Sequence, residues 1–227
     1  NLNAKHKGNI IFDCMDDHSG FSTNSIEAIK FEKDLTVNSN LVIASSNLLN
    51  KKFKKLNKNT ILVKNATEVN HFNSPKKNGK LDDFIGRPLI GYFGAISDWF
   101  DLSIIEYCAS KKPDWNFILI GSMAGSDDLQ KLSGFKNVTF MGEIPYDELP
   151  GYYAYFDVCM IPFKKIPLTM ATNPVKFYEY ISDGKPVVSV DLPELLPYHS
   201  CCYIAKDKHD FLVKLISNCE CAIYVCY

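Results

Sequence analysis

The sequence lacks the features that mark several large classes of protein. Its 227 residues carry 25 basic and 26 acidic side chains, so it has no one-sided positive field of the kind that nucleic-acid binding requires. No apolar run reaches the roughly 18 residues of a transmembrane helix, and residues 1–8 lack the apolar stretch of a signal peptide. We therefore expect a soluble, cytoplasmic protein with no nucleic-acid partner.

Paired cysteines are also missing. The eight cysteines lie mostly inside apolar runs and never form a CxxC unit, and the five histidines are scattered. This pattern predicts buried, reduced thiols and no metal site. The cysteines are at positions 14, 108, 159, 201, 202, 219, 221 and 226.

The common catalytic signatures are absent as well. There is no GxGxxG, no GxxxxGK[ST] and no GxSxG, and the segment Gly121–Gly125 has its serine in the wrong place for a nucleophile elbow. These absences argue against a dehydrogenase, a P-loop NTPase and an α/β-hydrolase.

Short apolar runs alternate with helical patterns along the chain, which is typical of βα units and a parallel sheet. Strands are expected at Asn9–Cys14, Leu41–Ser45, Thr60–Val63, Leu89–Phe93, Asn116–Ile120, Val138–Met141, Val158–Pro162, Pro186–Val190 and Cys202–Ile204. Helices are expected at Ser25–Val37, Asn47–Leu56, Asp101–Ser110, Asp127–Leu132, Tyr146–Phe156, Val175–Ser182 and Lys208–Ser217. The fold class is α/β with Rossmann-like parallel sheets.

A polar segment without periodicity separates two parts of the chain. We expect a partial domain over 1–75, a linker over 76–87 and a complete domain over 88–227. The first part offers only three strands, too few for parallel strands buried on both faces. Since the sequence also lacks an initial methionine, we expect this part to be the end of a larger domain.

The most informative segment is Leu168–Val190. Asn173 can cap a helix, Pro174 suits the first turn, and Val175, Tyr178 and Ile181 are expected to face inward. Other side chains then share the outer face, among them Lys176 and Glu179. With Lys176 in the first turn, a helix N-terminus of about half a positive charge can hold a diphosphate, and Glu179 can accept hydrogen bonds from ribose hydroxyls. An exposed Lys–Glu pair, contributing about 0.2–0.5 kcal/mol, explains the same residues equally well.

Two turns after strands are further candidates. Gly94 and Ala95, followed by Ser97, allow a ligand to approach the backbone at the carboxyl end of a strand. A plain βα turn is the more frequent explanation of such a segment. The turn Gly142–Ile144 could expose backbone groups to the edge of a base, although alone this signal is weak.

In order along the chain, IGYFGAISDWFD, WNFILIGS, VTFMGEIPYDELPGYYAYFDVCMIPF and TNPVKFYEYISDGKPVV resemble the donor-binding half of a GT-B glycosyltransferase of the large group 1 (GT4-like) family. The resemblance covers nearly all of 87–217, and P-x-K-x-x-E-Y followed by GKPVV is its most specific element. Upstream, IIFDCMDD and LVIASSNLLNKKF…ILVKNATEVNHF resemble the end of that family's acceptor domain.

The resemblance implies a site for a UDP- or GDP-linked sugar, with no other cofactor. It implies that Gly94 and its turn lie beside the pyrophosphate, whose charge is held by Lys176 and the helix from Pro174. It also implies that Glu179 binds the ribose and that the turn Gly142–Ile144 contacts the base. The chain departs from the family at two points. Ala171 stands where many members have the first glutamate of Glu-x7-Glu. The glycine turn is followed by acidic residues, Asp98 and Asp101, instead of basic ones.

The acceptor side is less defined. Asp16 and Asp17, close to Asp13 after the first strand, could orient or deprotonate an acceptor hydroxyl, and a capped loop explains them equally well. His18 and His71 are expected at the surface. The helix at Asn47–Leu56 could place its lysines, Lys51–Lys55, on an anionic membrane carrying a lipid-linked acceptor, although a solvated lysine face is more frequent.

By resemblance, the chain transfers a sugar, with retention of configuration, to a saccharide or lipid-linked saccharide in surface polysaccharide synthesis. We expect this fragment to bind the donor without transferring the sugar, because most of the acceptor domain is absent. Two alternatives stay open: a GT-B sugar-nucleotide epimerase, and a non-catalytic nucleotide-binding or scaffold protein derived from the fold. The apolar tail 219–227 is expected either as an extra strand or as an altered gene end.

Overall fold

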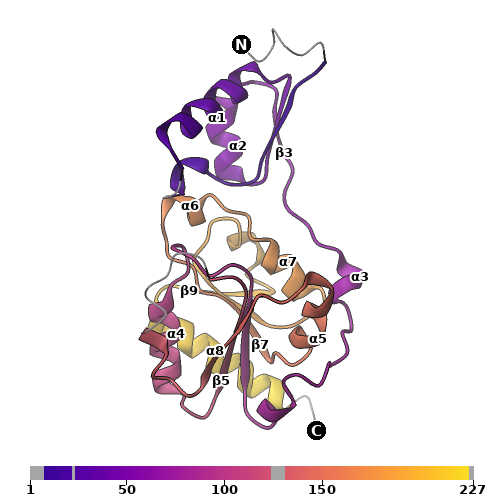
Figure 1. Ribbon diagram of the computed structural model, residues 1–227, viewed down its shortest axis with the longest axis vertical. Coiled ribbons are helices and arrows are strands. Elements are labelled where there is room, and N and C mark those ends of the chain that lie inside the picture. Colours follow the sequence, from indigo (N-terminus) through magenta and orange to yellow (C-terminus); the bar gives the residue numbers. More distant parts are fainter. Residues whose placement is uncertain (1–7, 22–23, 124–130, 225–227) are drawn as a thin grey trace. The chain divides into compact units, whose positions relative to one another are not determined.

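The computed structural model describes residues 8–21, 24–123 and 131–224, which form two compact units (Figure 1). The smaller unit contains residues up to 66 together with 165–174 and 192–194. The larger unit contains 67–164, 175–191 and the chain from 195 onward. The sequence-based division at 75 and 88 did not include the two later stretches that belong to the smaller unit.

The smaller unit is a parallel sheet with helices on one face. The strands β1 (Ile11–Cys14), β2 (Leu41–Ala44) and β3 (Thr60–Leu62) are in the order β1-β2-β3. The helices of this unit are α1 (Ile26–Asn38), α2 (Asn47–Lys54) and α6 (Pro167–Met170), with a 3₁₀ turn at His18–Gly20. Its core contains Phe12, Cys14, Val42, Ala44, Leu49, Phe53 and Ala171.

The other face of this small sheet is exposed within the described residues. Burial alternates along β1, where Phe12 and Cys14 face the core while Ile11 is 60% exposed. On β3, Ile61 is 45% exposed. The sheet therefore has the half-buried pattern that is more typical of antiparallel sheets than of parallel ones.

The larger unit contains a sheet of six parallel strands in the order β6-β5-β4-β7-β8-β9. The strands are β4 (Leu89–Phe93), β5 (Asn116–Ile120), β6 (Val138–Gly142), β7 (Val158–Ile161), β8 (Val187–Val190) and β9 (Cys202–Ala205). Every residue of β4, β5, β7 and β8 is buried. Both faces of this sheet are therefore covered, as the continuous apolar runs of these strands predict.

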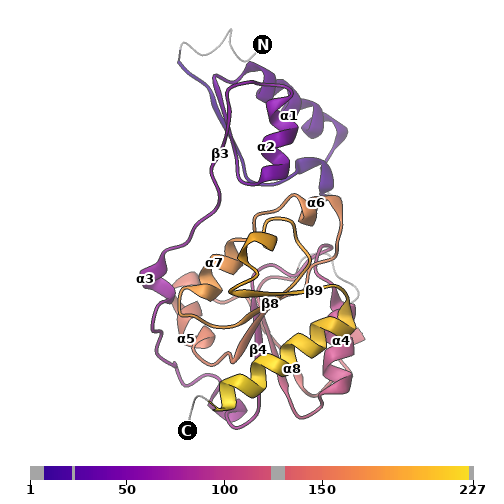
Figure 2. The same cartoon turned by 180° about the vertical axis from the view of Figure 1, so that it is seen from behind.

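Most helices of the larger unit lie between its strands along the chain, while the first precedes the sheet and the last follows it. The helices are α3 (Val69–Phe72), α4 (Leu102–Lys111), α5 (Leu149–Tyr153), α7 (Val175–Ile181) and α8 (Lys208–Tyr224), with 3₁₀ turns at Asp82–Phe84, Tyr146–Glu148 and Leu196–Tyr198. Helix α8 packs on β7, β8 and β9 and contacts α4 (Figure 2). Helix α7 packs on β7 and β8, close to the point where the strand order reverses between β4 and β7.

The predicted strands agree with the observed ones to within two residues at each end. The extra strand considered for the tail is wrong for residues 219–224, which belong to α8, and residues 225–227 lie outside the described residues. The helix expected at 127–132 falls largely outside the described residues.

The expectation of buried thiols is confirmed for Cys14, Cys108, Cys159, Cys202 and Cys219, while Cys201 is exposed. Burial raises the pKa of Cys108 to about 12.

The segment 76–87, expected as a linker, packs on the larger unit. The Tyr155 hydroxyl donates to Asp82 Oδ1 at 2.5 Å and accepts a hydrogen bond from Gly79 N at 2.8 Å. Leu81 is fully buried. These contacts hold the polar segment in one conformation although its sequence has no periodicity.

Candidate functional site

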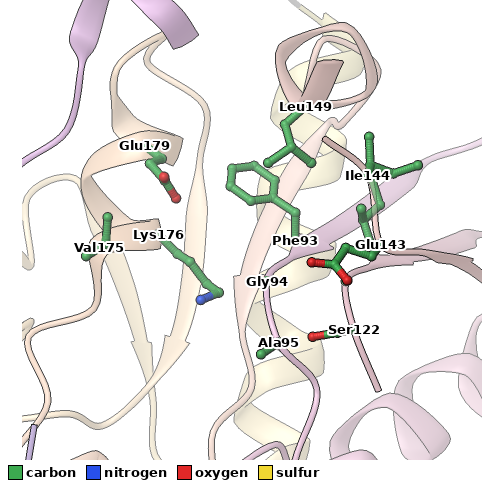
Figure 3. A pocket seen from close by; sticks show the side chains of 12 residues that line it. Phe93, Gly94, Ala95, Ser122, Glu143, Ile144, Leu149, Val175, Lys176 and Glu179 are labelled. Atoms are coloured by element: carbon green, nitrogen blue, oxygen red, sulfur yellow. The ribbon is translucent and has the colours of Figure 1, made fainter. Parts of the chain in front are cut away.

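A pocket of about 360 Å³ lies in the larger unit at the carboxyl ends of β4, β5 and β6 (Figure 3). Ligands of open α/β sheets bind at this edge, where the strand order reverses. All of the residues that line the pocket belong to the larger unit. They are Phe93, Gly94, Ala95, Ile120, Gly121, Ser122, Glu143, Ile144, Leu149, Val175, Lys176 and Glu179.

Two glycines form the floor of the pocket. Gly94 follows β4 with φ 134°, and Gly121 follows β5 with φ 145°. A Cβ atom at Gly121 would lie 2.0 Å from the carbonyl oxygen of Gly94. Gly94 N donates to Ile120 O at 2.8 Å, and Gly121 N donates to Gly142 O at 2.7 Å. The ends of the three strands are thus joined by hydrogen bonds, and both the positive φ and the close approach require glycine.

Lys176 extends from α7 over this floor. A Cβ atom at Gly94 would lie 1.9 Å from Lys176 Cε, so the lysine side chain passes directly over the glycine backbone. Its Nζ is 5.7 Å from the centroid of the Tyr92 ring. The Tyr92 hydroxyl donates to Ala95 O at 2.9 Å. The cation is therefore held where an anionic group entering the pocket would meet it.

Helix α7 faces the sheet with different residues from those predicted. Phe177 and Tyr180 are fully buried, whereas Val175, Tyr178 and Ile181 are only partly so. The prediction was wrong because the helix has apolar or aromatic side chains on more than one face. Tyr180 faces the sheet, and its hydroxyl oxygen accepts a hydrogen bond from Phe93 N at 3.0 Å. An apolar side chain at this position could not satisfy that buried donor.

Glu179 points into the pocket from the same helix (Figure 3). The residue is only 7% exposed, and its carboxylate accepts no hydrogen bond from the residues that the structure describes. Burial raises the pKa of this carboxyl group, while the charges of Lys176 and His71 oppose the shift. A buried carboxylate of this kind can accept hydrogen bonds from the hydroxyl groups of a ligand.

His71 and Tyr146 stand near this carboxylate, and the sequence analysis did not identify them as site residues. The His71 ring stacks on Tyr146 with centroids 4.5 Å apart, and its Nε2 lies 3.0 Å from Tyr146 O. Burial and the charge of Glu179 raise the pKa of Tyr146. His71 is held here because the neighbouring Phe72 is fully buried and stacks on Phe93, with centroids 5.6 Å apart. The only sequence signal was the position of His71 beside an apolar residue in a short helix.

Of the residues predicted to bind the donor, Gly94, Ala95, Ile144, Lys176 and Glu179 line the pocket. Ser97, Gly142, Asn173 and Pro174 are not among the lining residues.

Asn173 is buried in the smaller unit, where its Oδ1 accepts a hydrogen bond from Asn65 N at 3.0 Å. Asp101, one of the acidic residues after the glycine turn, caps α4 by accepting hydrogen bonds from the Ser103 backbone and side chain.

The aspartates predicted for the acceptor side lie in the smaller unit and have protein partners. Asp17 Oδ1 accepts hydrogen bonds from Ser19 Oγ at 2.5 Å and from Lys52 Nζ at 2.9 Å. Although burial raises the pKa of Asp17, these partners lower it by more. Asp16 Oδ1 accepts from Thr172 Oγ1 at 3.2 Å. Asp17 thus has a structural role, and a catalytic role for either aspartate stays a prediction.

Helix α2, considered for membrane contact, buries part of its apolar side in the smaller unit. Leu49 and Phe53 belong to the core of the smaller unit. Lys52 forms ion pairs with Asp17 and, at 3.2 Å, with Glu32. Leu49 and Phe53 are therefore not available to a membrane, and the contact considered for the lysines of this helix stays a prediction. Exposed lysines at 51, 54 and 55 remain.

Ala171 occupies the position at which the family often has a glutamate. It is fully buried and packs in the core of the smaller unit. A carboxylate there would be costly, because the surrounding side chains are largely apolar.

Among the described residues there is no cluster of three side chains suited to holding a metal ion. A search of the same residues found no helix with the length and apolar character needed to span a membrane.

A family model for glycosyl transferases of group 1 matches residues 87–219. TuaH of Bacillus subtilis (strain 168), a protein assigned to teichuronic acid biosynthesis as a glycosyltransferase, is 30% identical over 162 residues, or 70% of this chain and 41% of TuaH. The sulfoquinovosyl transferase SQD2 of Arabidopsis thaliana is 28% identical over 114 residues, or 49% of this chain and 21% of SQD2. The chain thus spans less than half the length of these relatives.

Solved structures have the same fold. HepE of Anabaena, determined with UDP and glucose, superposes with a TM-score of 0.67 at 19% identity, over 94% of this chain and 66% of HepE. TarM of S. aureus superposes with a TM-score of 0.74 at 11% identity, over 98% of this chain and 46% of TarM. These likenesses confirm the predicted fold class. Since the family model also covers more than half of the sequence, the chain belongs to the group 1 glycosyltransferases.

Proposed function

We propose that this chain carries the donor-binding part of a glycosyltransferase that uses a nucleotide-diphosphate sugar. The observation that supports this most directly is Lys176, whose side chain lies over Gly94 in the pocket with the buried Glu179 one turn further on. The cation and the glycine turn match the diphosphate of such a donor, and the carboxylate matches its ribose hydroxyls.

In the proposed reaction, an acceptor hydroxyl oxygen forms a bond with the anomeric carbon of the donor sugar. The bond from that carbon to the β-phosphate oxygen breaks, and its electron pair leaves with the nucleoside diphosphate. The hydroxyl proton goes to a base or to water. Lys176 stabilises the negative charge that develops on the leaving diphosphate. The transferred sugar is a hexose, and its anomeric configuration is retained. The reaction needs no further cofactor.

We further assign the acceptor to the saccharides or lipid-linked saccharides of surface polysaccharides. The assignment to teichuronic acid biosynthesis of TuaH supports this class of acceptor. Lysines 51, 54 and 55 could bring the chain to the inner face of an anionic membrane, each contributing about 1 kcal/mol near the surface. Co-sedimentation with vesicles containing phosphatidylglycerol, compared with vesicles of phosphatidylcholine alone, tests this contact. Alanine at the three positions should abolish it.

The donor site is tested by calorimetric titration of UDP, GDP and their sugar conjugates into the chain. Lys176→Ala should weaken nucleotide binding by roughly 10–100-fold, the equivalent of one or two charged hydrogen bonds. Glu179→Ala should weaken the binding of nucleotides by a comparable factor. Lys80→Ala and Glu106→Ala, at exposed positions outside the pocket, serve as controls and should bind like the wild type.

The outcome separates the proposal from its alternatives. If the folded wild type binds no nucleotide, a scaffold protein derived from the fold becomes the better interpretation. If a sugar nucleotide binds and is converted to a modified sugar without an acceptor, the chain is an epimerase. Binding that both pocket variants weaken supports the donor site. Release of nucleoside diphosphate only when an acceptor is present would support transfer and would contradict the expectation that this fragment binds the donor without transferring the sugar.

A further inference from the structure

Glu143 is a charged residue of the pocket to which the proposed function gives no role. It follows β6, and its carboxylate extends into the pocket toward Gly94 from the side opposite to Lys176 (Figure 3). It forms no ion pair or hydrogen bond with the residues that the structure describes. With Glu179 it gives the lining two carboxylates and one lysine. This balance is unfavourable for a ligand that is anionic throughout, so the ligand should present hydrogen-bond donors to Glu143.

The two walls of the pocket differ in chemistry. On the α7 wall, Lys176 lies over the Gly94 backbone and holds the anionic part of a ligand. On the opposite wall, Ile144 and Leu149 offer apolar surface beside Glu143. A planar, uncharged base fits the second wall, with its faces against the apolar side chains and its edge toward the carboxylate. This placement rests on the proposed function, in which the ligand is a nucleotide-diphosphate sugar.

An ionised carboxylate has two acceptor oxygens and no donor. Guanine is the common base that presents two adjacent donors, N1–H and the 2-amino group, and it can bond to both oxygens at once. Uracil presents one N–H between two carbonyl oxygens, so a carboxylate facing that edge gains one bond and is repelled by its neighbours. Glu143 is exposed in the empty pocket, so the preference rests on the bond that uracil does not form and on the repulsion by its carbonyl oxygens, which together amount to about tenfold in affinity.

We propose that Glu143 determines the base of the donor and makes the pocket select a guanosine diphosphate sugar over a uridine diphosphate sugar. The solved structure of HepE contains UDP, but at 19% identity that likeness concerns the fold and does not carry over the base. The side chain that follows Gly142 therefore determines which base binds. A substitution at that position does not require any change in strand β6.

The test is calorimetric titration with GDP, UDP and inosine diphosphate, which has the guanine ring system without the 2-amino group. The wild type should bind GDP about tenfold or more tightly than UDP, and inosine diphosphate should fall between them. Glu143→Gln keeps the size of the side chain and removes its charge. It should weaken GDP binding about tenfold, leave UDP binding equal or stronger, and reduce the difference between GDP and inosine diphosphate.

Glu148→Gln is the matched control, because Glu148 is an exposed glutamate nearby that does not line the pocket. It should leave all three affinities unchanged. A wild type that binds UDP as tightly as GDP overturns the inference and leaves the proposed function intact. An equal effect of Glu143→Gln on GDP and UDP also overturns it, because the carboxylate would then act on the diphosphate or sugar. Failure to bind any of the three nucleotides overturns the proposed function together with the inference.

Discussion

The smaller and the larger unit both bury acidic side chains, and they differ in what those side chains contact. In the smaller unit, Asp17 is bonded to Ser19 and Lys52. Glu194, 2% exposed, accepts from Asn47 N and forms an ion pair with Lys64 at 3.0 Å. In the larger unit, Glu179 is buried at the pocket with no hydrogen bond from the described residues. A buried carboxylate with protein partners stabilises the fold, whereas one that faces a pocket is available to a ligand.

The two sheets show a related difference. The larger sheet is covered on both faces, and its strand ends close the floor of a pocket. The smaller sheet has one face exposed among the described residues, with Ile11 and Ile61 at the surface. A parallel sheet can thus keep its strand order while only one face packs, provided that the packed face carries a sufficient core.

The largest expected effect concerns that core. Phe53→Ala removes a ring that is 1% exposed and contacts the edge of Phe12 at a centroid distance of 5.9 Å. It should lower the free energy of unfolding by about 3–5 kcal/mol, measured by urea denaturation followed by circular dichroism. Leu48→Ala, on the exposed side of α2, should cost less than about 1 kcal/mol. Equal losses would mean that α2 does not face the core as described.

The next effect tests the structural carboxylate. Asp17→Asn removes a charge that pairs with Lys52 and should lower the free energy of unfolding by about 1–3 kcal/mol. Nucleotide affinity should not change, because Asp17 is outside the pocket. Asp13→Asn, at an exposed position on β1, is the control and should have little effect. A loss of nucleotide binding with Asp17→Asn would remove the distinction between the two kinds of carboxylate.

The pH dependence of stability should also report on Asp17. Its pKa is lower in the folded chain than the usual 3.8, because the partners Ser19 and Lys52 outweigh the effect of burial. The stabilisation is therefore fully present above pH 3.8 and is lost as the pH falls through the folded pKa. Urea denaturation of the wild type should show this acid loss, and the Asp17→Asn variant should show less of it.

The smallest expected effect is a gain in the free energy of unfolding, where the preceding variants lose it. The pKa of Glu179 is higher in the folded chain than the usual 4.5, since burial disfavours its charge. Folding stability should therefore fall as the pH rises from 4.5 through the folded pKa. Glu179→Gln should make the chain slightly more stable than the wild type at neutral pH, with no gain once the wild-type carboxyl is protonated. The same variant should bind nucleotide more weakly, and a variant that lost stability at neutral pH would contradict the ligand-facing role.

The sequence predicted the fold well because parallel strands buried on both faces leave continuous apolar runs, such as Asn116–Ile120. It predicted Gly94, Lys176 and Glu179 as pocket residues through a turn, a helix start and a spacing of three residues, which are local features, together with the resemblance to the family. The inward face of α7 could not be predicted, since the choice of Tyr180 depends on a backbone donor 87 residues away. The partners of Asp17 and the stacking of His71 on Tyr146 depend in the same way on contacts distant in the sequence.

The hydroxyl of Tyr180 joins α7 to the end of β4, and Lys176 is one turn earlier on the same helix. The ammonium group and the Gly94 turn are therefore already in register before a ligand arrives. Little conformational entropy should then be lost when an anion binds, and binding should not wait for a rearrangement of the helix. Tyr180→Phe keeps the ring and removes this tether. Nucleotides should therefore associate with this variant more slowly than with the wild type.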